Sequence, residues 1–261
     1  MIDNTSAISE FFLVPGKILY CNGMGTLKED AEAHAKAIAD LTGVEVELHY
    51  NNTTTLHKAL LITSKVSLGI LGAGYAVGSL ASKVHNKWIT RAVGCTSIAT
   101  LISGAVGWSE IEKQKDASAQ ILADKVKAYL EAHPLHHITM IFHSQGADIG
   151  HRALKKLDGY KQRINVVAIG GIVNIPDSFA NRVVNFVNDN DMIAYIAHAL
   201  FDQRAGTKTK VQIEDKMSDY LGSHYSTGYL NKSQVKEAIQ EFAKPRHYSL
   251  IRSSGPMRLS H

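Results

Sequence analysis

Short apolar runs alternate along the chain with longer segments in which apolar residues recur every three to four positions. The short runs are typical of buried strands, and the periodic segments of amphipathic helices. The expected strands are 17–21, 44–50, 138–142, 164–172 and 182–188, with 209–214 as a further candidate. The expected helices are 28–41, 113–133, 147–157, 192–201 and 231–244. Strands separated by single helices favour right-handed crossovers, so the sequence predicts an α/β fold with a mostly parallel sheet and helices on both faces.

One region breaks this alternation. Two apolar stretches, 66–82 and 92–109, contain no charged residue and are rich in glycine, alanine and serine. A membrane-spanning helix needs about 20 apolar residues, and each stretch lies near that lower limit. The spacing of Gly74 and Gly78 suits close packing between helices. The sequence therefore predicts an inserted apolar helical hairpin at 59–109, which either packs within the fold as a cap or associates with a membrane.

The remaining residues, 1–58 and 110–261, are assigned to one core domain, because 261 residues suit a large domain with an insertion. The insertion leaves the sheet at the carboxyl end of a parallel strand, the edge at which functional groups gather in such sheets. We therefore expect the insertion to cover or gate a site at that edge, or to bring the site to a lipid surface.

Composition excludes several classes of function. The formal net charge is only +4, and no basic stripe with interleaved aromatic residues accompanies it, so nucleic acid is not an expected partner. The two cysteines, Cys21 and Cys95, make neither a disulfide framework nor a zinc-ligand set. No His-Glu-x-x-His or Cys-x-x-Cys motif is present. We expect neither a metal nor a cofactor.

The two ends of the chain bear on location. The opening residues, MIDNTSAISEFFLVPGK, have no basic segment before an apolar one, which argues against a secretory signal. The expected location is cytoplasmic. Membrane contact through 66–82 and 92–109 is the alternative, and export without a cleavable signal stays open. The basic residues near the other end are interpreted as a solvated tail, with weak attraction to a membrane surface as the alternative: Lys244, Arg246, Arg252 and Arg258.

The segment ITMIFHSQGADIG (138–150) carries the leading candidate for chemistry. Ser144 lies between a predicted strand and a predicted helix, the context in which a serine is presented as a nucleophile. Gly146 occupies the second glycine position of the G-x-S-x-G pattern, but Phe142 replaces the first. A bulky residue there must find room beside the neighbouring strand, and it predicts a locally altered turn. We expect His143 to be structural or to line the pocket.

A nucleophilic serine needs a histidine base and a carboxylate that orients it. Asp191 follows the strand predicted at 182–188 and is favoured over Asp189, with Asp177 a more distant alternative. His224 lies in a predicted loop before the last helix. The other late histidines fit the order Ser…Asp…His less well: His198, His247 and His261.

Backbone N–H groups are expected to stabilise the negative charge that develops on a substrate carbonyl. One would come from Gln145, the residue after the serine. The other would come from the turn NGMGT, with Gly23 or Met24 as donor, since glycine lets a backbone approach a substrate closely. An ordinary tight turn is an equally good interpretation of these glycines.

In this order, KILYCNGMGT, FHSQG, VNDNDMI and GSHYSTGYL resemble the lipase/esterase-like branch of the α/β-hydrolase superfamily, over roughly residues 15–58 and 110–245. The asparagine-glycine opening is also similar to that of uncharacterised bacterial hydrolases. The resemblance implies a three-layer fold and a Ser–His–Asp hydrolase without cofactor.

The apolar insertion favours a lipid or acyl-chain ester or thioester as substrate. An acyl-protein thioesterase or a peptidase is a further possibility. The alternative from another class is a catalytically silent scaffold whose apolar hairpin binds a membrane or a partner protein.

Overall fold

The computed structural model describes residues 8–53, 108–188, 191, 194, 210–213, 224 and 226–251. The strands are β1 (Ile8–Cys21), β2 (Val46–His49), β3 (His136–His143), β4 (Ile164–Ile169), β5 (Arg182–Asn188), β6 (Lys210–Ile213) and β7 (Arg246–Ile251). The α-helices are α1 (Lys28–Thr42), α4 (Trp108–Ala132), α5 (Gln145–Leu154), α7 (Ser226–Leu230) and α8 (Ser233–Phe242). Two short 3₁₀ helices are η1 (Asp158–Arg163) and η2 (Asp177–Phe179).

The strands lie in the order β2-β1-β3-β4-β5-β6, and each neighbouring pair in this path is parallel. The predicted α/β architecture with a mostly parallel sheet is therefore confirmed. Because the strands run in one direction, the segments that follow β1, β2, β3 and β5 all emerge at the same edge of the sheet. That edge holds the candidate site.

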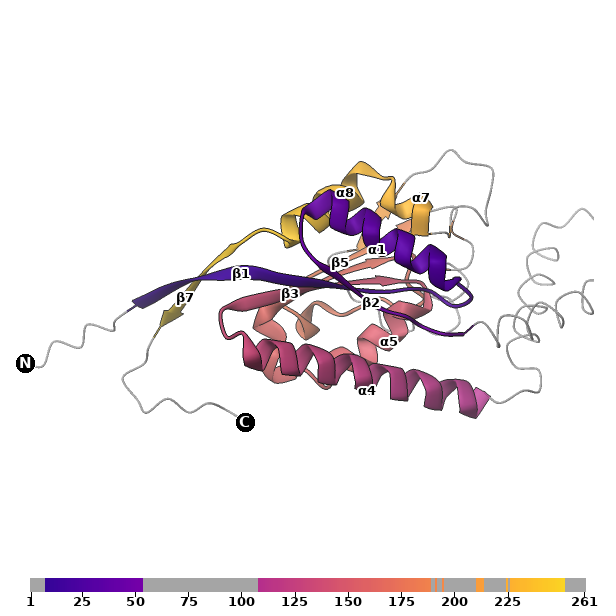
Figure 1. The fold of residues 1–261 in the computed structure, drawn as a ribbon, viewed down its shortest axis with the longest axis horizontal. Helices are drawn as coiled ribbons and strands as arrows, with labels where there is room; N and C mark the ends of the chain where they lie inside the picture. The colour runs from indigo at the N-terminus through magenta and orange to yellow at the C-terminus, as the bar shows by residue number, and fades with distance from the viewer. Residues whose placement is uncertain are drawn as a thin grey trace, which may run out of the picture.

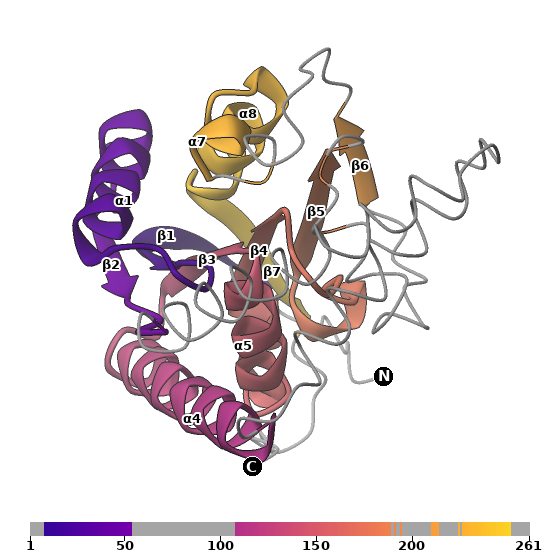
Figure 2. The ribbon, with the colours of Figure 1, turned by 90° about the vertical axis from the view of Figure 1, so that its right-hand side faces the viewer.

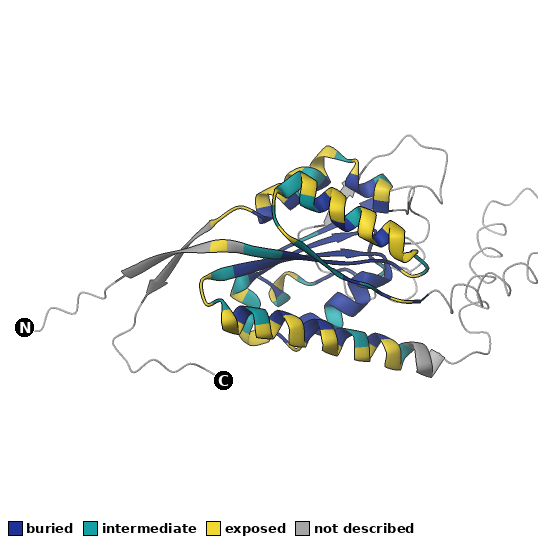
Figure 3. Cartoon of the chain, in the orientation of Figure 1, coloured by how far each residue is buried: buried dark blue, intermediate teal, exposed yellow. Residues whose placement is uncertain are grey.

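Helices cover both faces of the sheet (Figure 1). Helices α1, α7 and α8 lie on one face, and α4 and α5 on the other, as the view along the sheet also shows (Figure 2). Each face has its own apolar cluster, because successive residues of a strand point to opposite sides. The strands are buried in the middle layer while the outer faces of the helices are exposed (Figure 3).

The first strand is longer than predicted. The sequence pattern gives 17–21, whereas β1 begins at Ile8 and its pairing with β3 shifts between Pro15 and Lys17. Its first half pairs antiparallel with β7, from Ile8 opposite Ile251 to Leu13 opposite Arg246. The segment interpreted as a solvated tail therefore includes a β-strand at 246–251. The two paired segments lie at opposite ends of the chain, so neither reveals the other in a local pattern.

Other predicted elements agree with the structure in type and differ at their ends. The closing helix predicted at 231–244 corresponds to α8 alone, whereas α7 lies before it, in the segment around His224 that was predicted as a loop. Helix α4 begins at Trp108, so residues 108–109 belong to it and not to the insertion. The rest of the predicted hairpin lies outside the described residues, as does the helix predicted at 192–201 apart from Ala194. No helix in the described part of the chain has the length and apolar character needed to cross a membrane.

Candidate active site

Ser144 lies in the turn between β3 and α5, with φ 53° and ψ −121°. Among the described residues it is the one non-glycine residue with positive φ. A side chain disfavours this backbone conformation, at a cost of about 1–3 kcal/mol, and surrounding structure must hold it in place. The turn is held by backbone hydrogen bonds from the Ser144 N–H to Ile169 O (3.2 Å) and from the Ala147 N–H to Ser144 O (3.0 Å).

Gly146 lets α5 approach β1. A Cβ atom added there would lie 2.5 Å from the carbonyl oxygen of Cys21 and 2.9 Å from that of Asn22. Both obstacles are backbone atoms, which cannot turn away as a side chain could. The glycine expected two residues after the serine is therefore required for close packing.

Helix α5 also provides the room that Phe142 needs. The Phe142 ring is fully buried, and a Cβ atom added at Gly150 would lie 2.5 Å from its Cε1 and Cε2 atoms. The bulky residue that replaces the first glycine of the motif is thus matched by a second glycine one turn along the helix. The turn at Ser144 keeps its positive φ.

The structure brings Ser144, His224 and Asp191 together at the carboxyl edge of the sheet. The His224 Nε2 atom lies 2.8 Å from Ser144 Oγ, and its Nδ1 atom lies 2.8 and 2.9 Å from the two carboxylate oxygens of Asp191. Asp191 is fully buried, whereas Ser144 and His224 keep 6% and 9% of their surface exposed. We call these three residues the candidate triad.

The alternatives named from sequence are not part of this arrangement. Asp177 begins η2, which leads into the amino end of β5, away from His224. Asp189, His198 and His261 lie outside the described residues. His247 lies in β7, opposite Phe12 and remote from the carboxyl edge.

Asp191 is held by donors on several sides. Its Oδ1 atom accepts the Ala194 N–H (2.9 Å), and its Oδ2 atom accepts the Tyr229 hydroxyl (2.7 Å). The same hydroxyl oxygen accepts the Asn188 N–H (2.9 Å). Burial and the neighbouring carboxylate raise the pKa of Tyr229, so its phenol stays protonated and donates. Sequence reasoning did not single out Tyr229, although it lies within the segment GSHYSTGYL.

His143 contacts the backbone of His224, one residue of the candidate triad. Its Nε2 atom lies 2.7 Å from the carbonyl oxygen of His224. Burial and the nearby His224 lower the pKa of His143 to about 3, so the imidazole is neutral at ordinary pH. This agrees with the expectation that His143 is structural, and it identifies the group that His143 supports.

The loop at 22–26 is tied to the segment that follows β2. Asn22 Oδ1 accepts the Asn51 N–H (2.8 Å), and Asn22 Nδ2 donates to Gly23 O (2.9 Å). Thr53 Oγ1 accepts the Gly25 N–H (2.9 Å). Asn51 and Thr53 were not singled out in the sequence, although both follow the carboxyl end of a predicted strand.

Asn51 also links this loop to the turn at Ser144. Its Nδ2 atom donates to Gln145 Oε1 (2.9 Å), while Gln145 Nε2 lies 3.9 Å from Met24 Sδ. A Cβ atom added at Gly23 would lie 2.8 Å from Ser144 Cβ, so the loop passes directly beside the serine. Among the described residues, the backbone N–H groups of Gly23, Met24 and Gln145 have no hydrogen-bond acceptor. Gly23 and Gln145 therefore lie beside Ser144, with backbone N–H groups that no described residue accepts.

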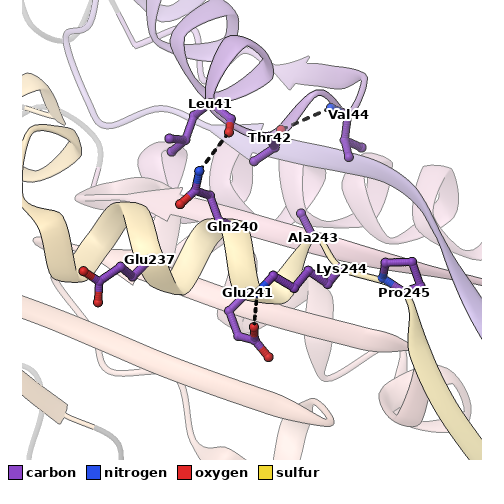
Figure 4. Close-up of a pocket in the computed structure, with 9 residues that line it drawn as sticks. All are labelled: Leu41, Thr42, Val44, Glu237, Gln240, Glu241, Ala243, Lys244 and Pro245. Atoms are coloured by element: carbon purple, nitrogen blue, oxygen red, sulfur yellow. Dashed lines mark hydrogen bonds and ion pairs between the residues drawn. The ribbon is translucent and has the colours of Figure 1, made fainter.

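A separate groove lies between the ends of α1 and α8 (Figure 4). Leu41, Val44 and Gln240 contribute to its lining, and Gln240 Nε2 donates to Leu41 O (3.2 Å) across it. Helix α1 ends just before β2 begins, so this groove lies at the amino edge of the sheet. It is opposite the candidate triad and takes no part in that site.

The described residues contain no cluster of three or more His, Cys, Asp or Glu side chains arranged to hold a metal ion. No protein-family model matches the chain, and no curated protein matches it. Function is therefore inferred from the residues and their geometry.

Proposed function

We propose that the protein is a serine hydrolase that cleaves a carboxylic ester or thioester. Ser144 is the nucleophile, His224 the general base and acid, and Asp191 the carboxylate that orients the imidazole. The observation that carries this proposal is the chain of 2.8 Å hydrogen bonds from Ser144 through His224 to Asp191. A serine hydroxyl is a weak nucleophile and becomes reactive when a histidine accepts its proton and a carboxylate orients that histidine.

In this mechanism Ser144 Oγ attacks the carbonyl carbon while its proton passes to His224 Nε2. Asp191 stabilises the imidazolium through Nδ1–H. Collapse of the tetrahedral intermediate breaks the bond to the leaving oxygen or sulfur, which takes the proton from His224. Water then attacks the acyl-enzyme with His224 again accepting a proton, and the acid is released as the proton returns to Ser144.

The oxyanion of the intermediate is assigned to the N–H of Gln145 and an N–H of the 22–26 loop, from Gly23 or Met24. Their lack of acceptors among the described residues supports this role. The link from Asn51 to Gln145 (2.9 Å) would hold the two sides at a constant separation. Donors that are already oriented stabilise developing charge without reorganisation.

A lipid or acyl-chain substrate is proposed on the apolar character of 66–82 and 92–109, which follow β2 in the chain. A series of p-nitrophenyl esters from acetyl to palmitoyl tests this directly. We expect kcat/KM to rise with chain length. A preference for acetyl, or for peptide substrates, would contradict the acyl-chain proposal. The same series as thioesters would separate an esterase from a thioesterase.

The sharpest test of the reaction class is labelling of the intact protein with a fluorophosphonate probe. We expect labelling of the wild type and none of Ser144→Ala. Ser118 provides a matched control, because its Oγ atom also lies 2.8 Å from a histidine nitrogen, Nε2 of His49. Burial lowers the pKa of His49 to about 4, and no carboxylate among the described residues is hydrogen-bonded to it.

Ser118→Ala should therefore label like the wild type. A folded wild-type protein that stays unlabelled would contradict the hydrolase proposal and favour the silent scaffold. Equal labelling of Ser144→Ala would place the nucleophile elsewhere.

A further inference from the structure

His143 lies on the face of β3 that supports the candidate triad. Successive strand residues alternate in direction, so Phe142 points to the cluster under α4 and α5, while His143 points with Ile141 to the opposite face. That face is covered by α7, whose first residue follows His224 by two positions. The rings of His143 and His224 are 5.3 Å apart and inclined at 42°.

We propose that His143 is a positioning residue that fixes the peptide of His224, through a hydrogen bond from its Nε2–H to the His224 carbonyl oxygen. The separation of these atoms is 2.7 Å. Asp191 holds the His224 side chain and His143 holds its backbone, so the imidazole is fixed at both ends. This role rests on the proposed function, since it concerns the alignment of His224 with Ser144.

The tautomer of His143 follows from its surroundings. Its Nδ1 atom is buried without a hydrogen-bond partner among the described residues. If the proton were on Nδ1, a buried donor would be unpaired and the Nε2 lone pair would face the carbonyl lone pairs of His224. Both arrangements are costly. In the Nε2–H tautomer the one unfavourable feature is an Nδ1 acceptor without a donor among the described residues, which costs less. The Nε2–H tautomer is therefore the stable one.

On its other side the His143 ring lies close to Gly23. A Cβ atom added at Gly23 would lie 2.9 Å from His143 Nδ1. The imidazole of His143 thus fills the space between the 22–26 loop and the His224 peptide. A side chain of equal size without a donor would keep this packing and lose only the hydrogen bond, which makes the two contributions separable.

The test compares His143→Gln, which retains a side-chain N–H near the Nε2 position, with His143→Phe, which retains bulk alone. The readout is the rate of fluorophosphonate labelling per folded molecule. We expect a loss of about 10- to 100-fold for His143→Phe, because misaligned catalytic groups lose rate steeply. His143→Gln should stay within about threefold of wild type, since it restores the donor. Equal rates for the two variants would overturn the proposal.

His137 is the matched control, because it is buried in the same strand and its Nε2 atom lies 3.2 Å from the carbonyl oxygen of Phe242. His137→Phe should lower stability and leave the labelling rate of the folded protein unchanged. An equal loss of rate in His137→Phe would show that both effects are general destabilisation.

Nitrogen-15 NMR of the wild type tests the inference without any variant and without turnover. We expect His143 to be the neutral Nε2–H tautomer, and the Nδ1–H proton of His224 to give a downfield signal that is lost in His143→Phe. An Nδ1–H tautomer would overturn the proposal even if the variants fail to fold. If the wild type is not labelled at all, the hydrolase proposal fails, and the NMR result still decides the role of His143.

Discussion

At the residue scale, Tyr229 is an example of one buried side chain that serves two groups. Its hydroxyl donates to Asp191 Oδ2 (2.7 Å) and accepts from the Asn188 N–H (2.9 Å). Deleting it would remove this acceptor from the buried Asn188 N–H and a donor from a buried carboxylate. Hydrogen bonds to charged groups are worth more than neutral ones, and unpaired buried groups are costly.

Tyr229→Phe is therefore expected to lower the free energy of unfolding by about 2–3 kcal/mol, measured by chemical denaturation. Tyr160→Phe is the control, because its hydroxyl also donates to a carboxylate, Glu131 (2.6 Å), but at the surface. The control should change stability by less than about 0.5 kcal/mol. Similar losses in the two variants would mean that burial does not increase the contribution of the Tyr229–Asp191 hydrogen bond to the free energy of unfolding.

Gly23 gives a second prediction at this scale. Any side chain there would collide with Ser144 Cβ at 2.8 Å and with His143 Nδ1 at 2.9 Å. Both neighbours are buried and fixed, so the 22–26 loop must move away from the serine. We expect Gly23→Ala to slow fluorophosphonate labelling about 100-fold, because the oxyanion donor moves with the loop.

Gly159→Ala is the control for this change, since nothing lies within 4 Å of a Cβ atom added at Gly159. It should label at the wild-type rate. Wild-type labelling of a folded Gly23→Ala protein would remove the 22–26 loop from the proposed oxyanion site.

At the element scale, α5 is fitted to β1 and β3 by two glycines one turn apart. Gly146 faces backbone oxygens of Cys21 and Asn22, and Gly150 faces the ring of Phe142. On its outer side α5 is joined to α4 by a buried ion pair, Lys115 to Asp148 at 2.6 Å. Lysine and arginine neighbours hold the pKa of Asp148 below its usual value although burial opposes this. Helix α5 is therefore held on its inner side by close packing on the sheet and on its outer side by the ion pair with α4.

The close packing of Phe142 on Gly150 predicts that Gly150→Ala destabilises the protein when the ring is present and stabilises it when the ring is absent. In the wild type, Gly150→Ala should cost about 1–3 kcal/mol of stability, because the added methyl group overlaps the ring. In a Phe142→Ala background the overlap is absent, and alanine is a better helix former than glycine by about 1 kcal/mol. There Gly150→Ala should stabilise the protein. Denaturant titrations of the four proteins in this cycle measure both effects.

Gly146→Ala is the control for this cycle, because it meets backbone oxygens whichever residue occupies position 142. It should destabilise both backgrounds. If Gly150→Ala has the same effect with and without the Phe142 ring, the two residues do not share the space assigned to them.

At the scale of the whole molecule, the two edges of the sheet differ. The carboxyl edge holds the candidate triad and its buried polar neighbours, whereas the amino edge carries the α1–α8 groove and the antiparallel pair of β1 and β7 (Figures 1 and 4). Packing at the first edge buries histidines in neutral form. Burial lowers the pKa of His143 to about 3 and that of His49 to about 4.

These histidines predict a loss of stability in mild acid. Below the unfolded pKa, near 6.5, the unfolded chain binds a proton that native His143 does not take up until about pH 3. The unfolded state thus binds more protons, and stability falls as pH falls, by about 1 kcal/mol per pH unit for each such group. Carboxylates with lowered pKa values, such as Asp148, contribute only at lower pH.

Free energies of unfolding measured between pH 5 and 6.5 test this. His143→Gln should show a shallower slope than the wild type by about 1 kcal/mol per pH unit, whatever its stability at pH 7. An unchanged slope would mean that His143 is protonated in the native state within this range.

Much of the fold followed from local patterns. Buried strands such as 138–142 and 164–172 are short apolar runs, and a run of this kind can be recognised without knowledge of its neighbours. The strand pair β1–β7 was missed, because the pairing partners of Ile8–Leu13 lie at the other end of the chain. The insertion at 59–109 stays a prediction apart from residues 108–109, which belong to α4.

The sequence by itself determined which residues meet at the candidate site. Ser144, Asp191 and His224 each follow a strand or precede a helix in the expected order, and parallel strands bring such positions to one edge. Only the tertiary structure decided what holds them: His143 on the His224 carbonyl, Tyr229 on Asp191, and Gly150 beneath Phe142. The physical reason is that the type and succession of the elements follow from local periodicity, whereas hydrogen bonds and close packing depend on directions and distances between segments far apart in the chain.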